Sequence, residues 1–578
     1  MDKKRIRILR IGLALAVVAI AVRLFWIQII QHDEYVAKAA EEHVSENVIE
    51  AERGEIYMMD GQEVVPVVLN ETVYSVIFDP LMVNEEKAKE VLEKYAKDKL
   101  VAKWEDVFSN KMMRYYVVAR NVNYEMAKKI QEEELSGVSF EKGTKRVYVE
   151  GEMASGVLGF VNADGEGQYG VEGAFNEELS GVNGTLKAVR DASGVALSIG
   201  EDNVEIPAVD GKDVVLTIDR NIETNVEKIL SGYINGKTEA TNASAVVLDP
   251  QSGKVLAMAN VPTYNPADYG NVKDIRSYMN NVTEVAYEPA SVCKTFTFAA
   301  AIDLGVMTAG TLYNNTGKMT VDTLTFENAW KGQYGTISMQ TAFDYSLNTG
   351  SATALMLIGG GSFNEGGRQK LYDYYQKFGL GQYTGIELFE SAGFVPGPNA
   401  YDYTMDFTYA NTTFGQGMNL TMLQVAAGVA SVINVGNYYE PTIIAGEMKD
   451  GEFSEAEPKA AVRKTISEET SAAMRAMMWG TRNTKRLQGV DKAGYYIGGK
   501  TGTGQVVQED GSYSEATAQG ETVGGYVGFG GTEGELPRYV VMIKLWGDGI
   551  HIGGEQVVPV FDEINEYLLN YLKIQPKV

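Results

Sequence analysis

The first hydrophobic segment of the chain has the length of a membrane-spanning helix. Apolar side chains dominate residues 11–30, interrupted by Arg23 and Gln28, and about 20 apolar residues cross a hydrocarbon core as a helix. Basic residues precede it: Lys3, Lys4, Arg5, Arg7 and Arg10. Because such a flank stays in the cytoplasm, we expect a cytoplasmic tail at residues 1–10, one transmembrane helix at 11–30 and an extracytoplasmic remainder.

Two features of this region have alternative interpretations. Ala37-Lys38-Ala39 has the pattern of a signal-peptidase site, so the segment is either removed or retained as an anchor. We favour an anchor, because the apolar stretch is long and a polar spacer follows it. Arg23 either reaches the headgroups or pairs with a polar group on the transmembrane helix of a partner.

Beyond residue 30, segments with the two-residue period of strands alternate with segments that have the 3.6-residue period of helices. In the first half we expect strands at 64–78 and 213–218, and helices at 85–99, 124–134 and 221–230. Glycines punctuate residues 159–211, which predicts turns and short strands there.

The second half begins with a predicted hairpin. Two apolar runs, 243–248 and 254–259, flank an Asp-Pro-Gln-Ser-Gly turn. The other expected elements are buried helices at 291–306 and 419–435, strands at 500–504, 524–529 and 539–545, and a last helix at 556–572. This order predicts an α+β fold with helices on the faces of a sheet. A break in the pattern at 235–242 indicates a boundary between domains at 31–235 and 236–578.

Composition excludes several classes of protein. The chain has 578 residues, enough for about two to four domains. A net charge of −26 repels nucleic-acid phosphates, so we expect no nucleic-acid partner. One cysteine and three histidines exclude an intramolecular disulfide and a cysteine-rich metal framework. We expect no metal or cofactor.

The first candidate for chemistry is Ser291-Val292-Cys293-Lys294, at the start of a predicted buried helix. Residues three apart share a helix face, so the Ser291 hydroxyl and the Lys294 amine can meet. A serine at a helix start can attack a carbonyl while its own N–H helps to hold the oxyanion. Alone, however, the pattern matches many surface helices in which a serine caps the helix and a lysine is solvated.

Two further segments make coincidence a poor explanation. Ser346-Leu347-Asn348 brings a hydroxyl and an amide to a predicted turn, and Lys500-Thr501-Gly502-Thr503 forms a predicted strand entered through glycines. On that strand, Gly502 would let a substrate backbone lie alongside, while Thr501 and Thr503 present hydroxyls to a carboxylate. This trio, in this order, is typical of active-site-serine penicillin-binding proteins and β-lactamases.

The chain resembles the class B penicillin-binding proteins, the monofunctional peptidoglycan D,D-transpeptidases of division, elongation and sporulation. The resemblance covers nearly the whole chain. Matching segments are Tyr287-Glu288-Pro289-Ala290-Ser291, Gly415-Gln416-Gly417 with Thr421 and Gln424, Gly499–Gly504, Arg53-Gly54-Glu55-Ile56, Arg146-Val147-Tyr148, Leu158-Gly159-Phe160-Val161 and Gly170-Val171-Glu172. The departures are Met58 and Met59, where the family usually has Asp-Arg, and Ala290 in place of a common glycine.

The resemblance implies a β-rich pedestal of the dimerisation type at 31–235. It also implies a transpeptidase domain at 236–578, with an antiparallel sheet flanked by helices and an inserted helical subdomain. By this resemblance, Ser291 is the acylated nucleophile and Lys294 its general base. Ser346 relays the proton, and Lys500 supports Ser346 electrostatically. Asn348 would hold the acyl side chain, and Thr501, Gly502 and Thr503 the donor carboxylate end. The backbone N–H groups of Ser291 and Thr503 would form the oxyanion hole.

The implied reaction cross-links stem peptides through an acyl-enzyme formed on D-Ala-D-Ala, with β-lactams as inhibitors. A D,D-carboxypeptidase, a β-lactamase, and a β-lactam-sensing or scaffold protein of the same fold are the alternatives. Composition argues independently for a lysine base, because His551 is the one histidine after residue 43. We expect Cys293 to be a core residue. The implied partners are nascent glycan derived from lipid II and a polytopic glycosyltransferase of the SEDS family, which comprises the shape, elongation, division and sporulation polymerases.

Overall fold

The computed structural model begins with a long apolar helix, α1 (Lys3–Phe25), continued by a π-helical turn, η1 (Trp26–Ile30). Among the described residues, Lys4–Ile30 is the one helical span with the length and composition to cross a membrane. The structure describes residues 3–32, 34–35, 44–109, 113–189, 204–400, 404–484, 487, 493–505, 521–548 and 550–578. The possible cleavage motif at 37–39 lies outside these residues.

The chain divides into two units, one of residues up to 54 with 177–212, and one of 55–176 with 213–578. In the first unit, β1 (Val44–Ile49), β8 (Gly184–Val189) and β9 (Val204–Ile206) form an antiparallel sheet in the order β1-β8-β9. Strands β8 and β9 confirm the short strands predicted within residues 159–211. The short helices α7 (Gly170–Ala174) and α8 (Asn176–Ser180) were not expected from the glycine-rich pattern.

The second unit contains a seven-stranded sheet in the order β19-β18-β10-β2-β3-β4, with β5 also paired to β3. Its strands are β2 (Ile56–Asp60), β3 (Glu63–Phe78), β4 (Tyr116–Val122), β5 (Val138–Tyr148), β10 (Asp213–Asp219), β18 (Ile444–Lys449) and β19 (Glu452–Glu455). The predicted strands at 64–78 and 213–218 are confirmed. The last two strands come from the C-terminal half and join a sheet otherwise built by the N-terminal half.

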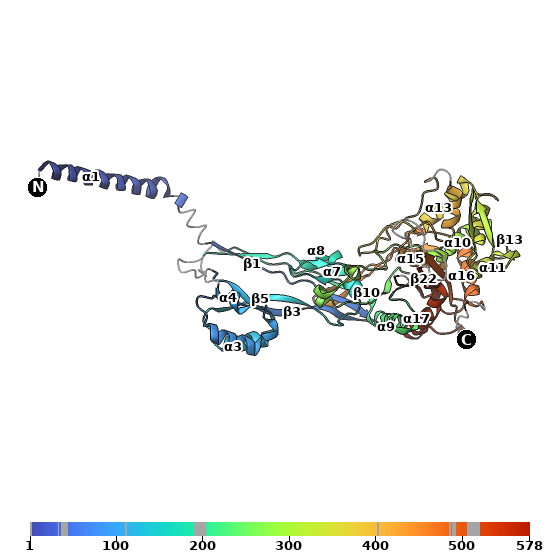
Figure 1. Ribbon diagram of the computed structural model, residues 1–578, viewed down its shortest axis with the longest axis horizontal. Coiled ribbons are helices and arrows are strands. Elements are labelled where there is room, and N and C mark those ends of the chain that lie inside the picture. Colours follow the sequence, from blue (N-terminus) through green and yellow to red (C-terminus); the bar gives the residue numbers. More distant parts are fainter. Residues whose placement is uncertain are drawn as a thin grey trace. The chain divides into compact units, whose positions relative to one another are not determined.

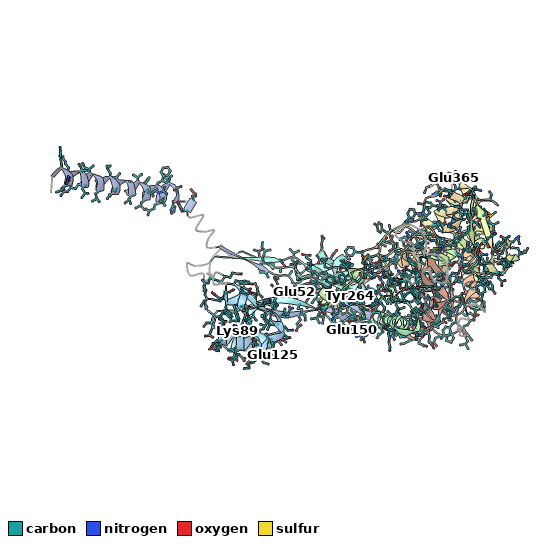
Figure 2. The ribbon with its side chains drawn as sticks, viewed as in Figure 1. Glu52, Lys89, Glu125, Glu150, Tyr264 and Glu365 are labelled. Carbon is teal, nitrogen blue, oxygen red and sulfur yellow. The ribbon has the colours of Figure 1, made fainter. Side chains whose placement is uncertain are left out.

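Helices α3 (Glu85–Tyr95), α4 (Trp104–Ser109) and α5 (Tyr124–Glu132) share a hydrophobic core with this sheet. Charged side chains such as Lys89 and Glu125 lie on the outside of α3 and α5 (Figure 2). The helix predicted at 85–99 ends early, because Ala96 leaves the helical region and Lys97–Lys99 form a 3-10 turn. Those three residues, Lys-Asp-Lys, offer no apolar side chain to the core.

A five-stranded antiparallel sheet in the order β12-β11-β23-β22-β21 lies at the centre of the C-terminal half (Figure 1). Its strands are β11 (Asn242–Leu248), β12 (Val255–Val261), β21 (Gly498–Gln505), β22 (Thr522–Gly530) and β23 (Tyr539–Trp546). The predicted hairpin and the three later strands are confirmed.

Helices cover this sheet. The apolar residues of α9 (Arg220–Gly232) and α17 (Val558–Tyr571) share one core with alternate residues of the strands. Helix α15 (Met422–Ile433) contacts β23 and β11, and α16 (Glu468–Arg482) contacts β21. The helix predicted at 291–306 begins as a 3-10 turn, η6 (Ala290–Cys293), and continues as α10 (Lys294–Asp303).

The predicted helical insertion is also present. It contains α11 (Met339–Asp344), α12 (Asn348–Ile358), α13 (Glu365–Lys377) and α14 (Met405–Thr412). Small strand pairs accompany them: β13 (Leu312–Asn315) with β16 (Gly335–Ser338), and β14 (Lys318–Val321) with β15 (Leu324–Glu327). The remaining short elements are α6 (Ser155–Leu158), β6 (Phe160–Val161), β7 (Gly167–Gln168), β17 (Asn437–Tyr438), β20 (Arg463–Lys464), η2 (Lys97–Lys99), η3 (Tyr233–Lys237), η4 (Pro266–Asn271), η5 (Ile275–Tyr278) and η7 (Gly554–Val557).

Candidate active site

Ser291 lies in a tight turn that the surrounding backbone holds in place. The preceding residue, Ala290, has a φ of +51°, a left-handed conformation that costs energy for a residue with a side chain. The Ala290 N–H donates to the Gly415 carbonyl over 3.1 Å. A Cβ at Gly415 would lie 2.2 Å from the Ala290 carbonyl oxygen, so a glycine is required there. This pairing explains why the glycine-flanked loop accompanies the nucleophile segment.

Lys294 is fully buried, and its Nζ lies at the centre of the site. It donates to Ser291 Oγ over 2.9 Å, which confirms the predicted meeting of residues three apart. It also contacts the Ser346 carbonyl at 2.7 Å, Ser346 Oγ at 3.2 Å and Asn348 Oδ1 at 2.9 Å. One amine therefore links the first two sequence motifs.

The turn between α11 and α12 presents Ser346 and Asn348. Ser346 has a φ of +55° and is, after Ala290, the second residue of the site with a left-handed backbone. Asn348 accepts from Lys294 and donates through Nδ2 to the Glu327 carbonyl over 2.9 Å. Because both ends of this amide are used, its orientation is set.

Lys500 approaches the same hydroxyl from strand β21. Its Nζ is buried and donates to Ser346 Oγ over 2.9 Å and to the Thr501 carbonyl over 3.1 Å. Burial raises the pKa of the nearby Asp344 carboxyl, which accepts from Gln340 Nε2 and Thr481 Oγ1, whereas the charge of Lys500 acts in the opposite direction.

Gly502 packs against the protein's own backbone. A Cβ there would lie 2.8 Å from the Pro289 carbonyl oxygen and 3.2 Å from Val292 Cγ1. The structure therefore gives this glycine a different reason from the one inferred from sequence: it lets β21 lie close to the nucleophile turn. The next residue, Thr503, accepts through Oγ1 from the Gly554 N–H over 2.9 Å.

A cleft of about 710 Å³ opens onto these groups. Ser291, Ser346, Asn348, Thr501 and Thr503 all line it. Gln416 of the glycine-flanked loop also lines it, together with residues that the motifs did not identify: Trp330, Tyr345, Gln505, His551 and Glu555. His551 Nδ1 lies 3.0 Å from Thr522 Oγ1. The rarity of histidine singled out His551, and no periodic pattern in the sequence marks the other residues that the motifs missed.

Cys293 lies outside this cleft. Its side chain is fully buried, and burial raises the pKa of its thiol. A thiol that stays protonated is a poor nucleophile. The expectation of a core cysteine is confirmed.

The three motifs thus converge on one row of groups: Ser291 Oγ, Lys294 Nζ, Ser346 Oγ and Lys500 Nζ. Each contact in the row is short enough for a hydrogen bond. Such a row can take a proton from an attacking hydroxyl and return it to a leaving group.

Family models match two parts of the chain. The penicillin-binding protein transpeptidase domain matches residues 243–566, and the penicillin-binding protein dimerisation domain matches residues 48–216. These ranges contain the five-stranded sheet with its helical insertion, and most of the N-terminal strands.

Characterised relatives are similar over most of this chain. Stage V sporulation protein D of Bacillus subtilis is 30% identical over 79% of this chain and 69% of its own length. Penicillin-binding protein PbpB of Mycolicibacterium smegmatis is 32% identical over 75% and 66%, so the chain spans about two thirds of these two relatives. Peptidoglycan D,D-transpeptidase FtsI of Escherichia coli is 26% identical over 96% and 89%.

Solved structures share the fold. Penicillin-binding protein 2X of Streptococcus thermophilus superposes with a TM-score of 0.72 at 24% identity, covering 92% of this chain and 81% of that one. Penicillin-binding protein 3 of Mycobacterium tuberculosis, complexed with aztreonam, gives 0.67 at 25% identity, covering 92% and 98%. Together with the family matches, these likenesses confirm the predicted fold. The chain belongs to the class B penicillin-binding proteins, in which a dimerisation domain accompanies a transpeptidase domain.

Proposed function

We propose that this protein is a peptidoglycan D,D-transpeptidase that cross-links stem peptides through an acyl-enzyme on Ser291. The observation that carries the proposal is the position of Lys294 Nζ, within hydrogen-bond distance of both Ser291 Oγ and Ser346 Oγ. One amine can therefore accept the proton of the nucleophile and pass a proton to a second hydroxyl.

In the first step, Lys294 acts in its neutral form and accepts the Ser291 proton as Oγ attacks the carbonyl of the penultimate D-Ala. The oxyanion is held by the backbone N–H groups of Ser291 and Thr503. The C–N bond then breaks, and a proton delivered through Ser346 leaves with the amine of the terminal D-Ala. The product is an ester on Ser291.

In the second step, an amine from another strand attacks this ester. Ser346 and Lys294 receive the proton of that amine, and the ester oxygen of Ser291 recovers a proton as it leaves. Lys500 remains a cation that supports Ser346. The protein thus returns to its starting state with a new amide bond between two stem peptides.

Substrate placement follows from the groups around the row. Thr501 and Thr503 line the cleft and offer hydroxyls to the terminal carboxylate of the donor, beside the charge of Lys500. Asn348, held by Lys294 and Glu327, would orient the acyl side chain. β-Lactams would occupy the same position and acylate the same serine.

The proposed arrangement in the cell follows from the N-terminal helix. Residues 1–10 would be cytoplasmic, residues 11–30 would cross the membrane once, and the pedestal at 31–235 would connect them to the transpeptidase domain at 236–578 outside. The chain would work on nascent glycan made from lipid II by a polytopic SEDS-family glycosyltransferase. The process that it serves would be division, elongation or sporulation, and one of the relatives named above is a sporulation protein.

The test uses the full chain in proteoliposomes with lipid II and a SEDS polymerase, followed by mass spectrometry of the digested muropeptides. We expect cross-linked dimers that disappear with Ser291→Ala. Trimmed monomers without dimers would identify a carboxypeptidase. If neither cross-linked dimers nor trimmed monomers form, the protein is a sensor or a scaffold, and the proposal is contradicted.

A further inference from the structure

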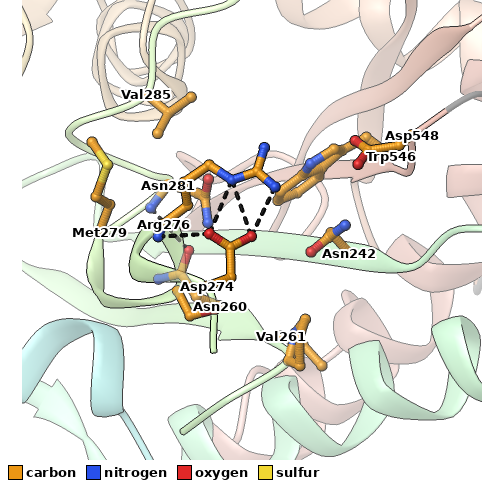
Figure 3. Close-up of a pocket in the computed structure, with 12 residues that line it drawn as sticks. Asn242, Asn260, Val261, Asp274, Arg276, Met279, Asn281, Val285, Trp546 and Asp548 are labelled. Carbon is orange, nitrogen blue, oxygen red and sulfur yellow. Dashed lines mark hydrogen bonds and ion pairs between the residues drawn. The ribbon is translucent and has the colours of Figure 1, made fainter. Parts of the chain in front are cut away.

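A second cavity, of about 330 Å³, lies at one end of the five-stranded sheet (Figure 3). Asn242 at the start of β11 and Trp546 at the end of β23 face each other in the strand register and contribute to its wall. Other wall residues come from 274–285, the segment that leads to the nucleophile turn. Among the described residues, none lines both this cavity and the catalytic cleft. We call it the indole cavity, after Trp546.

Several polar side chains of the indole cavity have unused hydrogen-bonding capacity. Within the described part of the chain, the carboxamide of Asn281 has no hydrogen-bond partner, and the carboxylate of Asp548 has neither a hydrogen bond nor an ion pair. Asn242 uses its Nδ2 on a neighbouring threonine, over 2.8 Å, which leaves its carbonyl oxygen available. These three groups can all turn to a ligand.

Another amide on the same wall behaves differently. Asn260 accepts through Oδ1 from Ser244 Oγ over 2.9 Å and donates through Nδ2 to Asn280 Oδ1 over 3.2 Å. Its role is therefore structural. The fold thus uses both ends of the buried Asn260 amide, whereas the Asn281 carboxamide and the Asn242 carbonyl oxygen keep capacity for a ligand.

The charges of the indole cavity favour a neutral ligand. Asp274 is paired with Arg276, whose Nη2 lies 2.7 Å from Oδ2. Asp548 would repel a phosphate or a carboxylate. Arg276 already supplies a cation to the cavity, and the hydrogen bond and charge of Asp274 and the charge of Asp548 raise the pKa of this guanidinium, so a second cation is disfavoured. Hydrogen-bonding capacity without a matching charge suits hydroxyl and amide groups.

A sugar ring has the complementary chemistry. Its C–H face packs on an indole, whose ring face carries partial negative charge, and its edge hydroxyls bond to planar amide and carboxylate groups. Figure 3 shows Asn242 and Asp548 near the indole, and Asn281 on the other side of the Arg276 side chain. The volume is at the lower end of the roughly 300–1,000 Å³ of small-ligand pockets.

The opposite wall indicates which kind of sugar. Met279 and Val285 lie on it, and Val261, the third apolar side chain of this group, lies apart from them, below Asn242 in the view of Figure 3. A bare hexose would leave these groups facing hydroxyls. An acetamido group would place its methyl against Met279 and Val285, and its N–H and carbonyl could meet the carboxamide of Asn281.

We propose that the indole cavity binds an N-acetylated hexosamine ring of a glycan strand. That the glycan is the strand carrying the stem peptides rests on the proposed transpeptidase function. Lys544 Nζ lies 4.1 Å from the ring centroid of Trp546 and 4.8 Å from that of Tyr287, so the wall of the cavity adjoins the nucleophile segment. A strand held here would keep its peptides close to the catalytic half of the protein.

The test measures binding of N,N′-diacetylchitobiose to the full-length protein by calorimetry, in a detergent without a sugar headgroup. Cellobiose, which lacks the acetamido groups, is the control ligand. We expect chitobiose to bind and cellobiose to bind at least tenfold more weakly. Asn281→Ala and Asp548→Ala should each raise the Kd about fivefold to tenfold, the effect of one lost hydrogen bond. Asn271→Ala, three residues before that segment and outside the cavity, should leave the Kd unchanged.

Two further variants separate this site from the catalytic one. Ser291→Ala, which removes the proposed nucleophile, should bind chitobiose normally, so a failure of the transpeptidase proposal would not affect this result. The proposal would be overturned if Trp330→Leu in the cleft abolished binding while Asn281→Ala and Asp548→Ala left it unchanged. Equal affinity for the two disaccharides, or no binding of either, would also overturn it.

Discussion

The amine of Lys500 donates a hydrogen bond to the hydroxyl of Ser346 over 2.9 Å, from an edge strand to a turn between two helices. The same hydroxyl lies 3.2 Å from Lys294 Nζ. Two ammonium groups around one hydroxyl repel each other, so one of the two amines is favoured in its neutral form. In the proposed mechanism the neutral amine is Lys294 and the cation is Lys500. The two lysines should therefore respond differently to the same substitution.

Lys294→Arg should nearly abolish acylation by a β-lactam, and Lys500→Arg should retain much of it. A guanidinium cannot give up its proton in the working range, and loss of a general base costs about 10²–10⁴ in rate. Lys500 needs only charge and a donor. The measurement is the acylation rate with a fluorescent penicillin. Equal losses in the two variants would contradict the assigned roles.

Ser291 should be the site of β-lactam attachment. Intact-mass analysis of the full chain after treatment should show one adduct. Ser291→Ala should remove it, because the nucleophilic oxygen is gone, and Cys293→Ala should keep it, because that thiol is buried outside the cleft. An adduct that survives Ser291→Ala would mean that another residue is the nucleophile.

A buried pair of carboxyl groups should make stability depend on pH. Glu223 accepts from the Met258 N–H over 2.7 Å, and Glu227 accepts from the Ala154 N–H over 2.9 Å. Burial raises the pKa of Glu223 to about 7, and burial together with the charge of Glu223 raises the pKa of Glu227 to about 9. Raised carboxyl pKa values mean that the folded state holds protons that the unfolded state releases above about 4.5.

Stability from this pair is therefore complete below pH 4.5 and is lost as the pH rises through about 7 to 9. For each proton that the folded state alone retains, the free energy of unfolding falls by about 1.4 kcal/mol as the pH rises by one. Glu223→Gln keeps the acceptor without the charge. Its thermal unfolding midpoint should exceed that of the wild type at pH 8 and match it at pH 5. Glu239→Gln, at an exposed glutamate, serves as the control. A constant difference across this range would refute the assignment of retained protons to this pair.

The N-terminal helix should remain on the mature protein. Its apolar stretch at residues 11–30 is long for a signal peptide, and basic residues precede it. Peptide mass mapping of the protein from membranes of the producing cell should find an N-terminal peptide that contains the residues before Ile11. A mature N-terminus at Ala40 would instead identify a secreted enzyme.

Arg23→Leu should weaken retention of the polymerase on purification from membranes. A charge within a membrane helix is costly unless a partner or the headgroups receive it. Gln28→Leu removes the second polar side chain of the same helix and should have the same effect. Wild-type retention in both variants would show that the helix only anchors the protein.

The sequence predicted best what local geometry determines. Ser291 and Lys294 are three residues apart, so a helical turn alone brings them together, and the hairpin at 243–259 follows from its turn residues. The convergence of Ser346 and Lys500 on that pair was expected only through resemblance, since 154 positions separate them. The left-handed conformation of Ala290 was not predicted, because its backbone is bonded to Gly415, which lies far along the chain. That of Ser346 belongs to the local ending of α11, where the Leu347 N–H donates to the Ala342 carbonyl, and it was missed because a serine stands where such endings usually have glycine.

The strand pair β18–β19 has a consequence for how the protein can be made. Without β18, strand β10 would be left with an open edge in the N-terminal sheet, because β18 is its neighbour on the side away from β2. Because a chain is synthesised from its N-terminus, this edge stays unpaired until residues 444–449 have also been made. An open edge invites pairing with other chains. A fragment that stops at residue 216 would carry that exposed edge permanently and would aggregate where the full chain does not.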